Sequence, residues 1–142
     1  MYNKIVLCLA YNQSQILLQL RNIDKKIIHP GTWGFFSGSI KLNESPEIAI
    51  KRELFEELGI LSFNKLNFVF RYYDAKTKSL YFVYRLRLPN YKLKLREGLD
   101  FEYFKNYEIL KKKKSKKIGT YFHFADNRLM KIFLHKFQKK II

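Results

Sequence analysis

The chain has 142 residues, of which 28 are lysine or arginine and 12 are aspartate or glutamate, so its formal net charge is +16. This length suits one domain, residues 1–142, and 47% hydrophobic residues are ample for one packed core. The N-terminus has neither a long apolar run nor a small-residue cleavage site, which argues against secretion and against a membrane span. A single cysteine, Cys8, cannot form an internal disulfide, and we therefore expect a cytoplasmic protein.

Apolar and aromatic runs predict strands on both sides of a central acidic segment. The four clearest strands are expected at residues 4–11, 15–21, 66–73 and 80–88. Asn12 and Gln13 suit a hairpin turn between the first two strands. Shorter strand-like stretches follow at residues 92–96 and 101–104. Apolar residues at helical spacing then predict an amphipathic C-terminal helix over residues 126–140.

The central acidic segment predicts a helix with defined ends. Ser45 suits the N-cap, Pro46 the first helical position, and Gly59 the left-handed residue that ends a helix. On the side of the helix opposite its glutamates, four apolar residues are expected to pack on a sheet: Ile48, Leu54, Phe55 and Leu58.

Three glutamates of this helix, Glu53, Glu56 and Glu57, are spaced at i, i+3 and i+4 and therefore share one helix face. Like charges so placed repel each other, so a counter-charge is expected. A hard divalent cation with oxygen ligands is the natural one, and we predict Mg²⁺, with Mn²⁺ as a substitute. A solvated acidic face is the alternative, but five of the twelve acidic residues lie between Glu44 and Glu57 in a strongly basic chain.

From Gly38 to Ile60 the residues follow the pattern G-x5-E-x7-R-E-L-x-E-E-x-G-I, which resembles the Nudix box in full. The resemblance implies an α/β fold, an α/β/α sandwich with a mixed central β-sheet. It also implies metal-dependent hydrolysis of a nucleoside diphosphate linked to another group. A pyrophosphate is densely negative, so a cation must neutralise it before water can attack phosphorus.

The resemblance also implies roles for individual residues of the box. Glu56 and Glu57 would be metal ligands, and Glu53 a further ligand or the base that activates water. Arg52 would pair with a box glutamate and hold it in place. Gly38 would offer its backbone carbonyl to the metal, and Glu44 would support the loop. Gly59 would end the helix.

Outside the box, residues 95–104 resemble the stretch from which family members supply a further carboxylate, so Glu97 is a candidate metal ligand. Residues 33–38 resemble the family's W-x-F-P-G-G entry to the box, with Phe36 and Ser37 in place of proline and glycine. Trp33 is also a natural core residue. Four residues are candidates for substrate binding. Arg21 could supply a cation and Phe35 a stacking surface, and Asp126 or Asn127 could bond to a base.

The box does not define the substrate. Length and the position of Glu97 favour a MutT-like pyrophosphohydrolase of (d)NTPs or oxidised nucleotides, and the lack of proline between Gly59 and Pro89 disfavours an ADP-ribose or nucleotide-sugar pyrophosphatase. A basic RNA-binding protein is the competing class, because Lys111–Lys117 contains six lysines, although such a run is typical of a solvated loop. A non-catalytic nucleotide sensor is disfavoured by the complete glutamate set.

Overall fold

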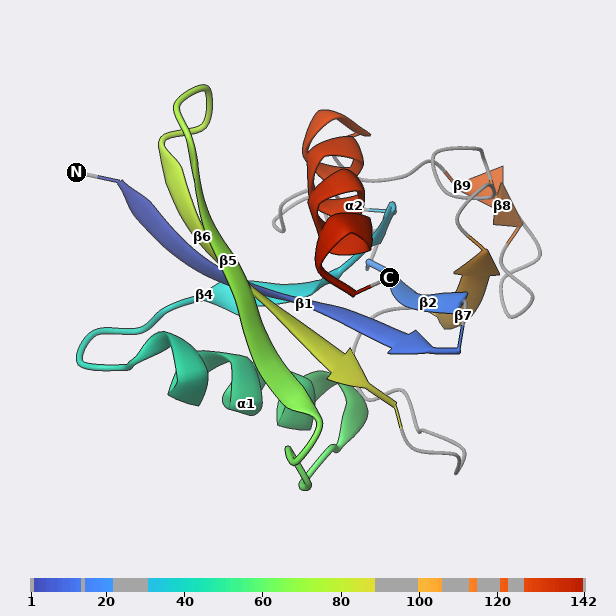
Figure 1. Cartoon of the computed structure of the whole chain (residues 1–142), viewed down its shortest axis with the longest axis horizontal. Helices are drawn as coiled ribbons and strands as arrows, with labels where there is room; N and C mark the ends of the chain where they lie inside the picture. The colour runs from blue at the N-terminus through green and yellow to red at the C-terminus, as the bar shows by residue number, and fades with distance from the viewer. Residues whose placement is uncertain are drawn as a thin grey trace.

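A sheet of seven strands lies between two helices in the computed structural model of the chain (Figure 1). The structure describes residues 2–13, 15–21, 31–88, 100–105, 113–114, 121–122 and 127–141, with the backbone only for 113–114, 121–122, 127 and 138–141. The elements in chain order are β1 (Asn3–Asn12), β2 (Gln15–Leu20), β3 (Trp33–Gly34), β4 (Phe36–Ser39), α1 (Pro46–Leu58), β5 (Leu66–Asp74), β6 (Ser79–Arg87), β7 (Asp100–Lys105), β8 (Lys113–Lys114), β9 (Tyr121–Phe122) and α2 (Asn127–Ile141).

The central strand β1 has different partners on its two edges. One edge pairs in parallel with β6 along almost the whole strand, and β6 pairs antiparallel with β5. The other edge pairs antiparallel with β4 over Ile5–Cys8 and with β2 over Ala10–Asn12. Beyond Leu17, β2 leaves β1 and pairs with β3, while β7 follows its other edge. The sheet is therefore mixed, as predicted, and it divides where β1 and β2 separate.

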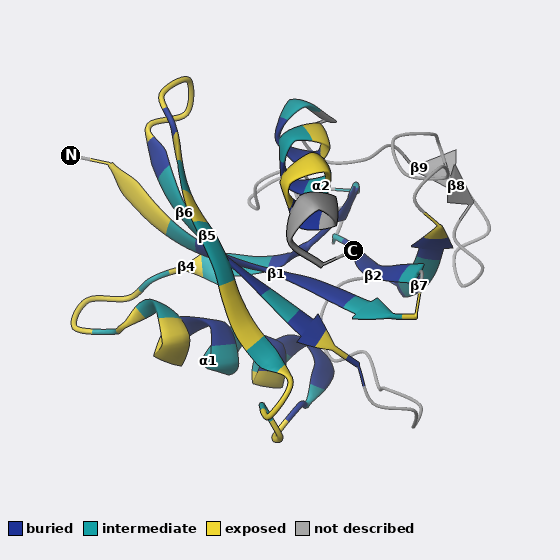
Figure 2. Ribbon diagram, in the orientation of Figure 1, coloured by how far each residue is buried: buried dark blue, intermediate teal, exposed yellow. Residues whose placement is uncertain are grey.

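Alternation along the strands gives the sheet two apolar faces, each covered by one helix. On β1, Val6 and Cys8 belong to the core under α1, and Leu7 and Leu9 to the core under α2. The buried residues run along both sides of the sheet (Figure 2). This arrangement confirms the predicted α/β/α sandwich.

The predicted ends of α1 are confirmed. The Ser45 hydroxyl accepts a hydrogen bond from the Ile48 N–H at 3.2 Å, Pro46 begins the helix, and Gly59 ends it with φ 67°. The predicted apolar face is wrong for Ile48 and Phe55, which are exposed. The buried stripe runs instead through Ile50, Leu54, Glu57 and Leu58, and because a helix turns 100° per residue, positions 48 and 55 fall on the outer side.

Other expectations have mixed outcomes. The hairpin at Asn12 and Gln13, the strand at residues 101–104 and the C-terminal helix are confirmed, and Trp33 is fully buried core. The lysine run is not entirely loop, because the backbone of Lys113–Lys114 pairs with β9. The stretch 92–96 lies outside the described residues. In the part of the chain that the structure describes, neither helix is long and apolar enough to cross a membrane.

An ion pair links α2 to the turn between β5 and β6. Asp74 is buried and accepts two hydrogen bonds from the Arg128 guanidinium, both at 2.9 Å, as well as bonds from the N–H and hydroxyl of Thr77. The hydrogen bonds from Arg128 are the main reason that the pKa of Asp74 lies well below its usual range. This pair fixes the start of α2 over the sheet.

Arg128→Ala should lower the free energy of unfolding by about 1 to 3 kcal/mol, because it leaves a buried carboxylate without its charged donor while Arg128 itself is half exposed. Urea unfolding at neutral pH measures the loss. Lys131→Ala, an exposed change on the same helix, should alter it by no more than about 0.5 kcal/mol. Equal losses in the two variants would contradict this account.

Candidate functional site

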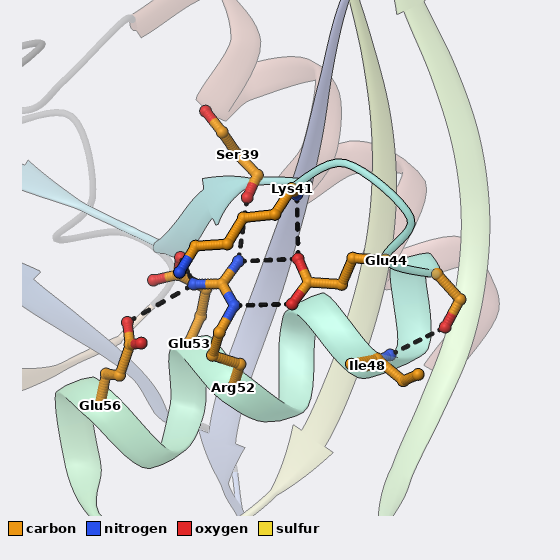
Figure 3. A network of polar contacts seen from close by, with 8 residues as sticks. Ser39, Lys41, Glu44, Ile48, Arg52, Glu53 and Glu56 are labelled. Carbon is orange, nitrogen blue, oxygen red and sulfur yellow. Dashed lines mark hydrogen bonds and ion pairs between the residues drawn. The ribbon is translucent and has the colours of Figure 1, made fainter.

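Arg52 connects the loop before α1 to the carboxylates on the helix (Figure 3). Its Nε donates to Glu44 Oε2 at 2.7 Å and its Nη2 to Glu44 Oε1 at 2.9 Å. Nη2 also donates to the Ser39 carbonyl oxygen at 3.0 Å. Nη1 donates to Glu53 Oε1 at 2.8 Å and lies 3.5 Å from Glu56 Oε2. One guanidinium thus binds three carboxylates and the end of β4.

Glu44 holds both the loop before α1 and the Arg52 side chain in place. Its Oε1 accepts a hydrogen bond from the Lys41 N–H at 3.0 Å, which closes the turn at residues 41–44. Hydrogen bonds from the Arg52 side chain, and secondly from the Lys41 backbone, lower the pKa of Glu44 from 4.5 to about 2. The same contact with Glu44 raises the pKa of Arg52 above its usual value. Glu44 is therefore ionised, as the predicted supporting role requires.

Gly38 adjoins Glu53 so closely that any side chain at this position would displace Glu53. A Cβ built on Gly38 would overlap the Glu53 carboxylate and would lie 2.7 Å from its Cγ. Gly38 lies on β4, paired with Val6 of β1. The glycine of the box is thus required by a close approach of α1 to β4, and the structure brings the Gly38 backbone beside a predicted metal ligand.

Glu57 lies deeper than the other box glutamates, with only 4% of its surface exposed. Its Oε1 accepts a hydrogen bond from Nε2 of Gln19, which is equally buried on β2, at 3.0 Å. Cys8 of β1 lies close enough for the Glu57 charge to contribute to the raised pKa of its thiol, although burial is the main cause. Sequence reasoning missed Gln19, and the signal was a polar residue within the apolar strand QILLQL.

Of the remaining candidates, Phe35 lies on the α2 side of the sheet, and several others are outside the described residues. Phe35 is buried in the core under α2, where its ring offers little surface for stacking. Arg21 follows β2, and its N–H donates to the Thr32 carbonyl at 2.8 Å. Glu97, Asp126 and the side chain of Asn127 lie outside the described residues.

The carboxylates of α1 have the chemistry of a site for a hard cation. Among the described residues, no three acidic, histidine or cysteine side chains converge closely enough to hold a metal ion. Instead, Arg52 binds Glu53 and Glu56, and Gln19 binds Glu57. Two carboxylates nevertheless meet at one positive nitrogen, Arg52 Nη1. Carboxylate oxygens are the ligands that Mg²⁺ and Mn²⁺ prefer, so these side chains have the right donor atoms for such an ion.

Fold and site together define a class of protein, a two-helix α/β/α sandwich whose acidic helix packs beside a glycine of the sheet. Comparison with protein families then finds that the family described as the NUDIX domain matches residues 1–124. The chain belongs to the Nudix family. The predicted membership of this family, and of its hydrolases, is thereby confirmed.

Solved structures share the fold at low sequence identity. A MutT protein from Methanosarcina mazei Go1 is 19% identical, with a TM-score of 0.71, over 99% of this chain and 96% of that one. The NUDIX domain of Shewanella oneidensis NrtR, solved with ADP ribose, is 16% identical, with a TM-score of 0.73, over 100% and 90%. A MutT/nudix family protein from Enterococcus faecalis is 18% identical, with a TM-score of 0.61, over 73% of this chain, which spans 44% of that protein's length. No curated protein matches significantly.

Gly38→Ala should displace the Glu53 side chain while leaving the fold intact, because the atoms that a methyl group would meet belong to a flexible side chain. We expect a loss of about 1 kcal/mol or less in the free energy of unfolding, and altered NMR signals for Arg52 and Glu53. Ser39→Ala is the matched control, since Arg52 binds only the Ser39 backbone. Unchanged Arg52 signals in Gly38→Ala would contradict the close approach.

The contact between Glu44 and Arg52 should make stability depend on pH in a defined window. Because the pKa of Glu44 is lowered, the unfolded chain takes up its proton first as the pH falls, so the stabilisation is complete above pH 4.5 and is lost towards about 2. Urea titrations of the wild type and Glu44→Gln across this range measure it. The difference between them should shrink on acidification, and a constant difference would contradict the assignment.

Proposed function

We propose that this protein hydrolyses the pyrophosphate bond of a nucleotide in a reaction that depends on Mg²⁺, with Mn²⁺ as a substitute. The observation that carries the proposal is the convergence of Glu53 and Glu56 on a single positive nitrogen of Arg52, beside a glycine that leaves room for Glu53. Family membership supports hydrolysis of nucleotide-linked pyrophosphates as the general reaction.

In this proposal, Glu56, Glu57 and the Gly38 carbonyl would hold the metal ion, with Glu53 and Glu97 as further ligands. The bound ion would neutralise the negative charge of the pyrophosphate and so allow water to approach phosphorus. Glu57 enters the site from within the core, where the hydrogen bond from Gln19 restricts its orientation. Restricted side chains need less reordering when a ligand binds.

Arg52 and Glu53 would divide the remaining work. Arg52 orients Glu53 through the 2.8 Å hydrogen bond, and its contact with Glu44 holds Arg52 itself in place. An ionised Glu53 can either bind the metal or accept a proton from the attacking water. Both roles require the same orientation, so Arg52 is proposed as a positioning residue for the reaction.

We favour (d)NTPs or oxidised nucleotides as substrates, in the manner of MutT proteins. Supporting this choice are the coverage of 96% of the Methanosarcina mazei MutT chain and the absence of proline between Gly59 and Pro89. ADP-ribose or a nucleotide sugar is the second candidate, because the NrtR domain that covers the whole chain was solved with ADP ribose. A cytoplasmic location belongs to the proposal and rests on the single, buried thiol of Cys8.

Glu56→Gln and Glu57→Gln should each reduce Mg²⁺-dependent kcat by about 100-fold or more, because an amide oxygen carries no charge for the cation. Product analysis by chromatography would measure the rates on (d)NTPs, oxidised (d)NTPs, ADP-ribose and nucleotide sugars and would show which phosphorus is attacked. Glu47→Gln is the matched control, an exposed acid of the same helix paired only with Lys51 in the described contacts, and it should retain full activity.

Thermal unfolding must show that both variants are folded, which the similar shape of glutamate and glutamine favours. Full activity in the two folded variants would exclude the proposed site. A folded wild type that binds nucleotides but hydrolyses none of the panel would instead favour a nucleotide sensor.

A further inference from the structure

Three aromatic side chains are exposed on strand β5 and beside it. Phe68 is 53% exposed and Tyr73 is 50% exposed, and Tyr2, 46% exposed, contacts Tyr73 edge to face with ring centroids 5.9 Å apart. Figure 2 shows an exposed stretch on β5. Exposed aromatic rings are costly to leave in water, so a cluster of them marks an interaction surface.

A β-bulge determines which rings are exposed. Phe68 pairs with Tyr84, whereas Phe70 pairs with Val83, so one residue of β5 is extra at this point. Before the bulge, Phe68 lies on the α1 side of the sheet, in edge-to-face contact with Tyr84. After it, Phe70 lies on the α2 side, against Phe133. Without the bulge, Phe68 would share the α2 side with Phe70.

Cross-strand pairing places two cations among these rings. Arg71 pairs with Phe82, and Tyr73 with Leu80, which is also the partner of Lys4 on β1. Paired and alternate residues share one side of a sheet, so five residues form one surface on the α1 side, here called the β5 face: Tyr2, Lys4, Phe68, Arg71 and Tyr73.

The β5 face itself carries two cations, Arg71 and Lys4, and the acidic side chain beside it, Glu47 of α1, is paired with Lys51. Among the basic residues between Leu66 and Arg87, Arg71 lies on the β5 face, whereas Arg85 and Arg87 alternate with Tyr84 and Leu86 and so lie on the α2 side; Asp74 is the one acidic residue of this stretch. Asp74 is buried and bound by Arg128, so it does not neutralise the exposed cations. A second copy of a chain with net charge +16 would be repelled by this surface, whereas a polyanion would be attracted.

We propose that the β5 face binds single-stranded nucleic acid, with bases stacked on Phe68 and Tyr73 and phosphates beside Arg71 and Lys4. Aromatic rings on an open sheet, spaced by cations, bind unpaired bases without a sequence requirement, and paired bases cannot reach them. Glu57 bonds to β2 on one side of α1, and Lys51 covers Phe63 on the other side. The β5 face lies beyond that second side. Binding there is therefore separate from the proposed hydrolysis.

Fluorescence anisotropy with a labelled oligothymidylate of about 12 nucleotides tests this proposal, since single-strand sites span roughly 4–16 nucleotides. Phe68→Ala and Tyr73→Ala should each weaken binding by about 5- to 100-fold, and Arg71→Ala should reduce the salt dependence. Phe68→Tyr and Tyr73→Phe keep a ring and should bind within about twofold of the wild type. Leu61→Ala, which removes an exposed apolar side chain elsewhere, is the matched control and should change nothing.

The proposal is overturned if the folded alanine variants bind the oligothymidylate as tightly as the wild type. That result would mean that lysines outside the β5 face bind the oligonucleotide. It is also overturned if the wild type binds a duplex of the same length equally well and the alanine variants lose both to the same extent. Sedimentation velocity covers self-association: conversion of an oligomer to a monomer by Tyr73→Ala, with unchanged oligonucleotide affinity, rejects nucleic acid as the partner. Nucleotide hydrolysis should be unaffected by Phe68→Ala, so failure here is distinct from failure of the proposed enzyme.

Discussion

The guanidinium of Arg52 is the interaction on which the geometry of the site depends. Glu53 and Glu56 follow it on the same helix, and without a cation their charges would repel each other and Glu44. Arg52 compensates these charges and at the same time binds the Ser39 carbonyl, so the helix, the loop and the end of β4 are held by one side chain. Lysine could not replace it, because three separate partners require the planar set of donors that only arginine has.

The division of the sheet explains why the site lies where it does. Where β2 leaves β1, strands β3 and β4 take over the free edges of β2 and β1. Gly38 on β4 and Gln19 on β2 thereby both face α1, and each contacts one glutamate of the helix. A regular sheet with β2 paired to β1 throughout would occupy Leu7 and Cys8, where Ser37 and Phe36 of β4 now pair. The irregular pairing is therefore part of the site.

Local signals in the sequence were sufficient for much of this structure. The ends of α1 were predictable because Ser45, Pro46 and Gly59 act through the backbone next to them, and the fold followed from the box between Gly38 and Ile60. Contacts between distant segments were not predictable. Nothing in the sequence shows that Gln19 meets Glu57, 38 residues away, or that Arg128 meets Asp74. The error at Ile48 and Phe55 arose because hydrophobicity alone was used to orient the helix.

The correct orientation of α1 is itself an argument for function. A helix that only packed on the sheet would have an apolar residue at position 57, because this position continues the buried stripe of Ile50 and Leu54. Burying a carboxylate there costs several kcal/mol before compensation, and the hydrogen bond from the Gln19 amide is one of the interactions that offset this cost. Glu56 is partly exposed, and Glu53, with 12% of its side chain exposed, is paired with Arg52. A carboxylate within the buried stripe is uncommon in a helix that only packs on a sheet, and the burial of Glu57 therefore supports the proposed metal-ligand role independently of the motif.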